Sequence, residues 1–415
     1  MDCVKKIGRI MQTIRWLVFG LAIFLCFGKS YQTVAANNPD PDTEAPSSKP
    51  GQAATGEKET EQTNEIYESI LEELDLEELE QEFRREGIEM PVSFSDMVKK
   101  QIKGDEKSVL SAFLETVSHA FFGTLAQNKS LLLELIGIVL IGSIFVNLSN
   151  SFASGLISEN GFYITYMLMT SLLLTSFSMA YGITVSALEK VLVAVRLFVP
   201  AFLLVLQFLG HTVAAGGTYH LVLIGIWVIQ AVIIRVVLPL IEFYVIVSMV
   251  NNLGKEDSFS KLCELVQSLI KWILKTIIAA VIGLNIIKGL LGPQMDILGK
   301  TMINRTLAAI PGSVVSVLAG TYLACGMIIK NSIGIAGIIL LSVICLIPLV
   351  QLFLLMFTVR ITTALIQPMG DRRYVDGTSA LAGGIGMLMQ ALASALVLFV
   401  VTLAIMAGAT NGSTG

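Results

Sequence analysis

Long apolar runs, separated by short polar segments, fill the chain from residue 131 almost to its end. A helix needs about 20 apolar residues to span about 30 Å of hydrocarbon. Backbone polar groups at that depth must bond internally, so such runs predict helices. The pattern therefore predicts an all-α fold, a polytopic transmembrane helical bundle over residues 131–410. The runs are Leu131–Leu148, Phe162–Tyr181, Val191–Leu209, Leu221–Val250, Leu269–Leu291, Pro311–Ile329, Ile333–Thr358 and Ala380–Gly408.

The number of spans depends on how Leu221–Val250 is built. This run is long for one crossing and contains Pro239, so it predicts either one tilted, kinked helix or two short helices that meet at the proline. The total is therefore seven to eight spans. With eight spans, Arg360 and Arg372 face the cytoplasm, but Lys255 faces outward, against the positive-inside tendency.

The first 36 residues have the order of a secretory signal peptide. Basic residues precede the apolar stretch Trp16–Phe27, and small residues end the segment at Ala35-Ala36. An uncleaved anchor is the alternative. Residues 37–64 are rich in proline and acidic residues, which predicts a disordered linker.

Residues 65–130 predict a small extracytoplasmic helical region, because they follow the signal peptide. Apolar residues recur at helical spacing on either side of Asp75, which with Glu78 resembles a capping box and predicts a helix start. Gly87 closes that pattern, and Ser93 or Ser95 is placed to cap a short second helix. This region forms either a small domain with its own core or helices that lie on the membrane or against a partner.

The composition excludes several function classes. The chain is 54% hydrophobic and 14% charged, and residues 37–130 carry 21 acidic against 9 basic residues, without a basic stripe for nucleic acid. Its five cysteines form no CxxC pair, and its three histidines lack metal-ligand spacing. We expect neither an enzyme nor a bound cofactor or metal.

Charged residues inside the runs are candidates for a polar site, because ionisable groups are costly at membrane depth. Arg235 and Glu242 lie seven residues apart on nearly one helical face, on either side of Pro239. We expect them to act as a unit, either with each other through a bend or with opposite charges on neighbouring helices. Extension of the side chains to the interface is the alternative, and the favoured one for Lys271, Lys275, Lys288 and Lys330.

Small residues recur four apart in the last run, as in Ala380 with Gly384 and Ala382 with Gly386. Small residues let helix backbones approach closely, so Gly384 and Gly386 are predicted helix-packing positions. Packing within the bundle and assembly with another subunit both fit this pattern.

Several stretches, in their order along the chain, resemble the stage III sporulation protein AE family of endospore-forming bacteria. The resemblance covers about residues 65–410 and rests on a set of short motifs. They are Phe94-Ser95-Asp96, Val237-Leu238-Pro239-Leu240, Val250-Asn251-Asn252-Leu253, Lys330-Asn331-Ser332-Ile333-Gly334-Ile335-Ala336-Gly337, Cys345-Leu346-Ile347-Pro348-Leu349 and Ala364-Leu365-Ile366-Gln367-Pro368-Met369-Gly370-Asp371.

The resemblance implies a non-enzymatic, multi-pass subunit in the mother-cell membrane around the forespore. It implies a complex with an ATPase-like protein, small membrane proteins and ring-forming exported domains, which links the two compartments. The conspicuous polar or structural positions within the shared motifs are Lys330, Asn331, Pro348, Gln367, Pro368 and Asp371. We expect Pro348 to kink a span.

Two other functions fit the same residues. The buried charges would serve a stand-alone secondary transporter, although the two halves show no internal symmetry. A membrane adaptor that only docks soluble partners would need the head, but it would need no polar pathway through the membrane.

Overall fold

The computed structural model describes residues 75–88, 93–102, 155–208, 224–254, 258–280, 313–368 and 372–408, with scattered positions at 115–141 and 282–283. Within these ranges every regular element is a helix, which agrees with the all-α prediction. All of them belong to one compact unit that begins at Glu59. The predicted signal peptide and linker lie outside the described residues.

Two short helices form the described part of the head. The first, α3, spans Leu76–Arg85, and the Asp75 carboxylate accepts a hydrogen bond from the Glu78 N–H at 3.0 Å, which confirms the predicted helix start. Gly87 ends the helix with a φ of +72°, a left-handed conformation that glycine adopts without a Cβ clash. The second, α4, spans Phe94–Ile102, and the Ser93 hydroxyl accepts from the Asp96 N–H at 3.3 Å.

A single helix, α6, covers Gly155–Phe208. Phe162–Tyr181 and Val191–Leu209 were predicted as separate spans, and that division is wrong. The connecting residues Gly182–Lys190 contain no proline, so every residue keeps the N–H donor that a continuous helix needs. At about 1.5 Å per residue, α6 is about 80 Å long, well over the thickness of one hydrocarbon layer.

The run that contains Pro239 forms one helix across Ile224–Asn251, not two short ones. A π-helical segment, η1 at Ile233–Val237, leads directly into α8 at Leu238–Asn251, with Pro239 in the first turn of α8. Proline has no N–H and its ring crowds the preceding turn, so the wider π turn lets the helix continue through it.

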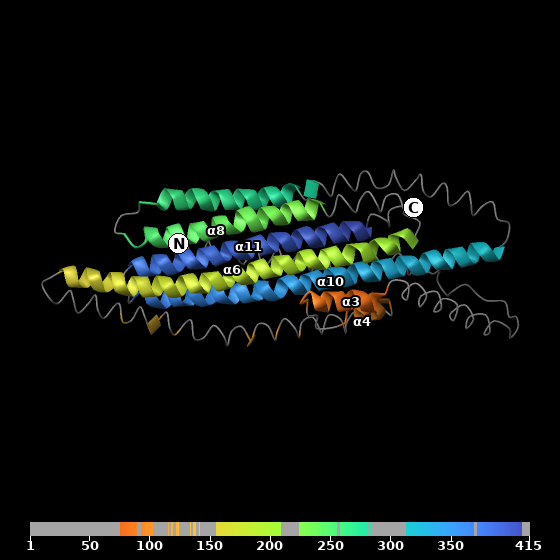
Figure 1. Cartoon of the computed structure of the whole chain (residues 1–415), viewed down its shortest axis with the longest axis horizontal. Helices are drawn as coiled ribbons and strands as arrows, with labels where there is room; N and C mark the ends of the chain where they lie inside the picture. The colour runs from red at the N-terminus through yellow and green to blue at the C-terminus, as the bar shows by residue number, and fades with distance from the viewer. Residues whose placement is uncertain are drawn as a thin grey trace, which may run out of the picture. The chain divides into compact units, whose positions relative to one another are not determined.

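The next helix, residues 260–280, returns alongside α8 (Figure 1). Asn251 fixes this turn, because its side-chain oxygen accepts from the Phe259 N–H at 2.7 Å and its side-chain nitrogen donates to the Ser260 hydroxyl at 3.3 Å. The Cys263 thiol is hydrogen-bonded to Ser248, so the two helices run antiparallel and in contact.

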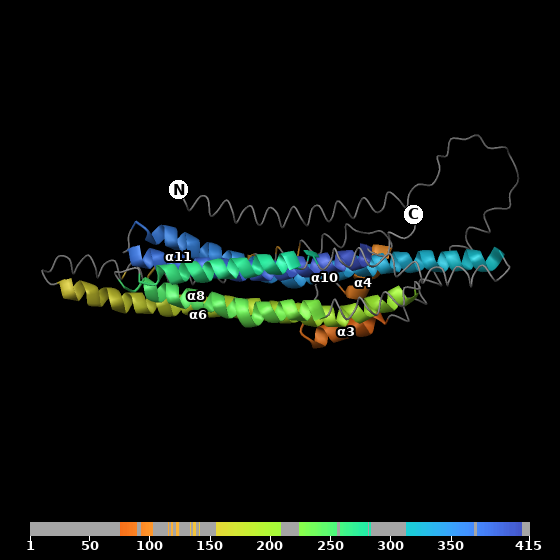
Figure 2. The ribbon, with the colours of Figure 1, turned by 90° about the horizontal axis from the view of Figure 1, so that it is seen from above.

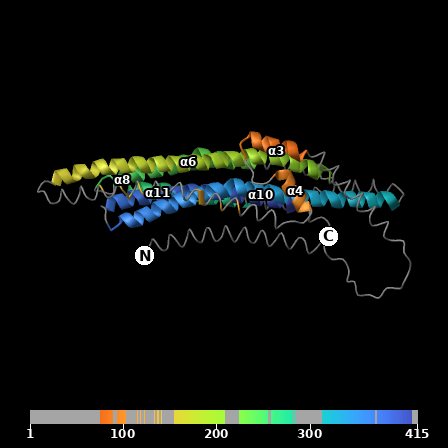
Figure 3. The ribbon, with the colours of Figure 1, turned by 90° about the horizontal axis from the view of Figure 1, so that it is seen from below.

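The core is built around α11, Arg372–Gly408, which packs against α6, α8 and α10. It packs most extensively against α10, Ser313–Ile366, which precedes it in the chain. Figures 1 and 2 show α6, α10 and α11 side by side, and Figure 3 shows α3 and α4 on the same bundle. The run Ile333–Thr358 and the described part of the run Pro311–Ile329, from Ser313 onward, form one helix, α10, so their division is also wrong.

Three helices of the described chain are long and apolar enough to cross a membrane, namely Ile224–Asn251, Gly326–Ile366 and Arg372–Val400. A membrane protein is therefore supported, but the predicted seven to eight spans are not confirmed.

Candidate functional site

An aromatic cluster joins the head helices to the long helices of the bundle. Phe94 of α4 meets Phe83 of α3 and Phe198 of α6 edge to face, at ring-centroid distances of 5.9 and 6.2 Å. All three rings are buried, and Phe198 also stacks on Phe202 at 5.8 Å. Such pairs add about 0.5–1.5 kcal/mol each beyond their burial. The head therefore shares a core with α6.

Gly337 of α10 provides the space for this cluster. A Cβ at residue 337 would lie far inside van der Waals contact with the ring of Phe198. Helix α4 also packs along α10. The head is thus held by two helices that are distant in sequence, and the shared motif around Lys330–Gly337 supplies one side of the contact.

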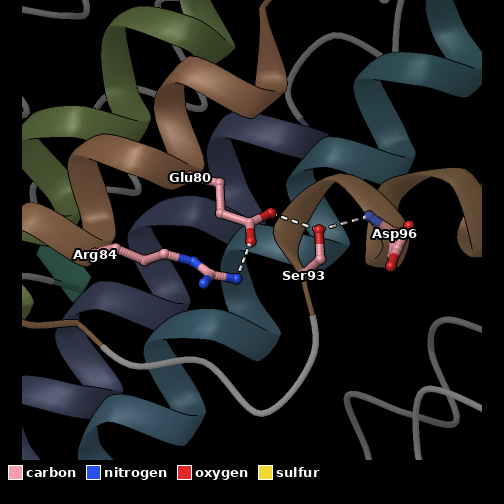
Figure 4. A network of polar contacts seen from close by, with 4 residues as sticks. All are labelled: Glu80, Arg84, Ser93 and Asp96. Atoms are coloured by element: carbon pink, nitrogen blue, oxygen red, sulfur yellow. Dashed lines mark hydrogen bonds and ion pairs between the residues drawn. The ribbon is translucent and has the colours of Figure 1, made fainter.

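Polar contacts at the edge of the same junction tie α3 to α4. The carboxylate of Glu80 accepts from Arg84 at 2.8 Å and from the hydroxyl of Ser93, which in turn accepts from the Asp96 N–H (Figure 4). Burial pushes the pKa of Glu80 upward, but the hydrogen bonds from Ser93, Arg84 and the Ser95 backbone outweigh it, so the pKa is lowered. Glu80 therefore stays ionised and couples the two helices.

A second cluster lies where α10 turns into α11, against the start of α6 and the end of α8. The Tyr166 hydroxyl donates to the Met249 carbonyl at 2.9 Å, and Thr165 and Tyr374 are hydrogen-bonded to each other. The guanidinium of Arg373 lies 3.3 Å from the centre of the Phe162 ring. These contacts place the Asn251–Asn252 motif and the Gln367–Pro368 turn at the same end of the bundle.

The structure does not pair Arg235 with Glu242. Both side chains, and Pro239 between them, are exposed on the outer face of η1 and α8. Neither charge forms an ion pair with any residue that the structure describes. Direct pairing through a bend is therefore not seen among the described residues, and the pairing of each charge remains a prediction.

The other predicted positions are spread over three places. Lys330 is buried, with 1% of its surface exposed, and Asn331 is half-buried; both lie on α10 one to two turns before Gly337. Pro348 lies inside α10, where the helix continues through it. Gln367 and Pro368 are exposed in the α10–α11 turn, and Asp371 lies outside the described residues.

Gly384 and Gly386 occupy different surroundings. A Cβ on Gly384 would lie far inside van der Waals contact with Cγ2 of Val245 and 3.3 Å from Phe177, so α11 meets α8 and α6 there. A Cβ on Gly386 would lie 3.5 Å from the sulfur of Met356, an ordinary contact. Their role in helix packing remains a prediction. Because the contacts are closer at Gly384, a larger residue should disturb the packing more there than at Gly386.

Sequence reasoning missed both aromatic clusters. Phe198 and Tyr166 occur within apolar runs, and Tyr374 follows a polar turn, so the sequence around none of them indicates its partner. Among the residues described, no group of three or more His, Cys, Asp or Glu side chains is placed to hold a metal ion.

Comparisons with known proteins agree with the family resemblance found in the sequence. The model of the family described as Stage III sporulation protein AE matches residues 92–410. The chain is also similar to Stage III sporulation protein AE of Bacillus subtilis (strain 168), with 22% identity over 410 residues, which cover 97% of this chain and 98% of that protein. No solved structure matches the chain.

Proposed function

Because the chain belongs to the stage III sporulation protein AE family, we propose that it is a non-enzymatic, multi-pass subunit of a sporulation complex linking mother cell and forespore. The observation that carries this proposal is the fixed junction of α3 and α4 with α6 and α10. A head locked onto long membrane helices can transmit or anchor a load from partners outside the membrane. A head on a free linker cannot.

The depth of the junction supports an exported head at the membrane surface. Gln230, near the start of the span Ile224–Asn251, donates to the Leu188 carbonyl of α6. The exposed charges Glu189 and Lys190 follow directly, and Phe198 lies about 15 Å further along α6. The hydrocarbon layer then ends near Glu189, and the charged head helices lie beyond it.

Charge distribution supports the same orientation. If α6 and α10 each cross once, the turn after α8 and the α10–α11 turn lie on the side opposite the head. Lys255, Lys261, Arg372 and Arg373 belong to these two turns or flank them. Placing all four in the cytoplasm satisfies the positive-inside tendency. Six crossings, with Leu131–Leu148 first, then replace the seven to eight predicted from the sequence.

The partners in this proposal are those that the family resemblance implies. They are an ATPase-like protein on the cytoplasmic side, small membrane proteins, and ring-forming proteins outside, which the acidic head contacts. The localisation is the mother-cell membrane around the forespore.

The test is a sporulating strain in which Phe94→Ala replaces the normal chain. We expect engulfment to finish, forespore reporter expression to fall, and spore counts to drop at least tenfold, while growth is unchanged. If the Phe94→Ala chain accumulates normally with its head still docked, yet the strain forms no spores, the function depends on a part of the chain other than the junction. Normal sporulation of a strain lacking the whole chain would overturn the proposal.

A further inference from the structure

One long face of the span Ile224–Asn251 is uncovered. Over an apolar stretch of each helix, 33% of the residues are buried in this span, compared with 61% in Gly326–Ile366 and 67% in Arg372–Val400. The exposed residues form a stripe along the helix, which we call the outer face. It contains Ile224, Val228, Arg235, Val236, Pro239, Glu242, Phe243, Ile246 and Val250.

Glu242 is the charge on the outer face that lies deepest in the membrane. It is nine residues, or about 13 Å, from Asn251 at the end of the span, and half the hydrocarbon layer measures about 15 Å. Arg235 is only five residues from Gln230, near the head-side boundary, so its long side chain extends to that interface. The shorter side chain of Glu242 does not reach either boundary, so this carboxylate needs cover within the membrane.

The surroundings of Glu242 supply no positive charge. Tyr181 of α6 lies within range of its field, but a tyrosine hydroxyl is neutral. No basic side chain in the described part of the chain forms an ion pair with Glu242. A lone carboxylate in contact with lipid is costly, so a cation from outside the described residues would stabilise it.

A second copy of this chain does not provide that cation. All copies share one orientation in the membrane, so a two-fold contact of the outer face sets Glu242 against Glu242. Docking on helix 260–280 of the next copy would offer Lys271, which already has an interaction within its own chain. It would also oppose like charges, because the side-chain contact of Cys263 with Ser248 puts Lys275 level with the residue after Arg235.

We propose that the outer face docks a membrane-spanning helix of a different protein, with a lysine or arginine near the middle of its apolar run that pairs with Glu242. Polar contacts between helices stabilise their association where water is absent. Phe243 and Ile246, 46% and 44% exposed, flank Glu242 along the same face and pack on the incoming helix around the charge pair. The apolar run Leu131–Leu148 of this chain contains no basic residue, so it does not match this occupant.

This inference rests on the proposed function for its membrane setting and gives the chemistry of one membrane partner. The experiment uses the full chain in sporulating cells, with a photoreactive benzophenone amino acid in place of Phe243. Irradiation should yield a cross-link to a second protein, and mass spectrometry should place it on an apolar run with a central lysine or arginine. The control probe replaces Met179, which is 59% exposed on α6 and nine residues from Leu188, the partner of Gln230, so it lies at a similar depth. It should not give this product.

Charge variants test whether the ion pair holds the helix. Glu242→Gln should reduce the cross-link at least fivefold at unchanged accumulation, whereas Glu242→Asp should retain most of it. Glu242→Lys should abolish the product, and a glutamate in place of the partner's basic residue should restore it. Cross-links only to lipid, to a second copy or to another segment of the same chain overturn the docking, as does a product that Glu242→Gln leaves unchanged. Any of these results in a strain that still sporulates leaves the proposed function intact.

Discussion

Gly384→Ala should destabilise the bundle although it adds only one methyl group. The new Cβ would overlap Cγ2 of Val245, a buried, β-branched side chain with little freedom to rotate, and would press on Phe177 at 3.3 Å. Overpacking of this kind costs about 1–3 kcal/mol. Alanine is favoured over glycine in a helix by about 1 kcal/mol, so the net loss should be up to about 2 kcal/mol. Gly384→Leu should prevent folding.

Gly386→Ala is the matched control, because its Cβ would meet only the flexible Met356 side chain at 3.5 Å. It should be neutral or slightly stabilising. The assay is thermal unfolding of the purified chain in mild detergent, with membrane accumulation as a second readout. Val245→Ala should rescue Gly384→Ala by removing the overlapping methyl group. Equal stability of both alanine variants, or failure of the rescue, would refute the packing argument.

Three further predictions concern the head. Phe94→Ala should cost about 3–5 kcal/mol at the junction and make α3 sensitive to protease in membranes, whereas Ile102→Ala should not; equal digestion of the two variants would contradict the shared core. The pKa of Glu80 is lowered in the folded chain, so its ionised carboxylate stabilises the junction at pH values above the unfolded pKa of about 4.3. This contribution is lost as the pH falls through the folded pKa, so hydrogen exchange in α3 should rise in acid. Glu80→Gln should remove that pH dependence. A cysteine at exposed Gln81 should react with a membrane-impermeant thiol reagent in intact protoplasts, and one at Lys261 only after lysis; the reverse pattern would invert the topology.

The features that could be predicted from the sequence are those that depend on residues close together along the chain. The Asp75 cap, the start of the second head helix near Ser93 and the helical character of the body follow from side chains that act within one turn. The number of crossings did not follow, because the polar segment Gly182–Lys190 resembles a loop in the sequence, yet α6 continues through it. Apolarity locates a helix more reliably than its ends.

The candidate site depended on contacts between distant segments. Phe94, Phe198 and Gly337 meet only because α6 and α10 pack against each other, and no spacing along the chain records that contact. Arg235 and Glu242 are both exposed and form no ion pair with a described residue, so their pairing remains a prediction. A shared face brings two charges to one surface, but it does not bring them into contact.

The most direct test of the central claim is purification of a tagged, functional chain from sporulating cells in mild detergent. A subunit of a complex that links the two compartments should co-purify with an ATPase-like protein and with ring-forming exported domains, in constant ratio and at a size well above one chain. In the Phe94→Ala variant, we expect the exported partners to be lost and the cytoplasmic partner to be retained. A functional chain that purifies alone as a monomer would contradict the account.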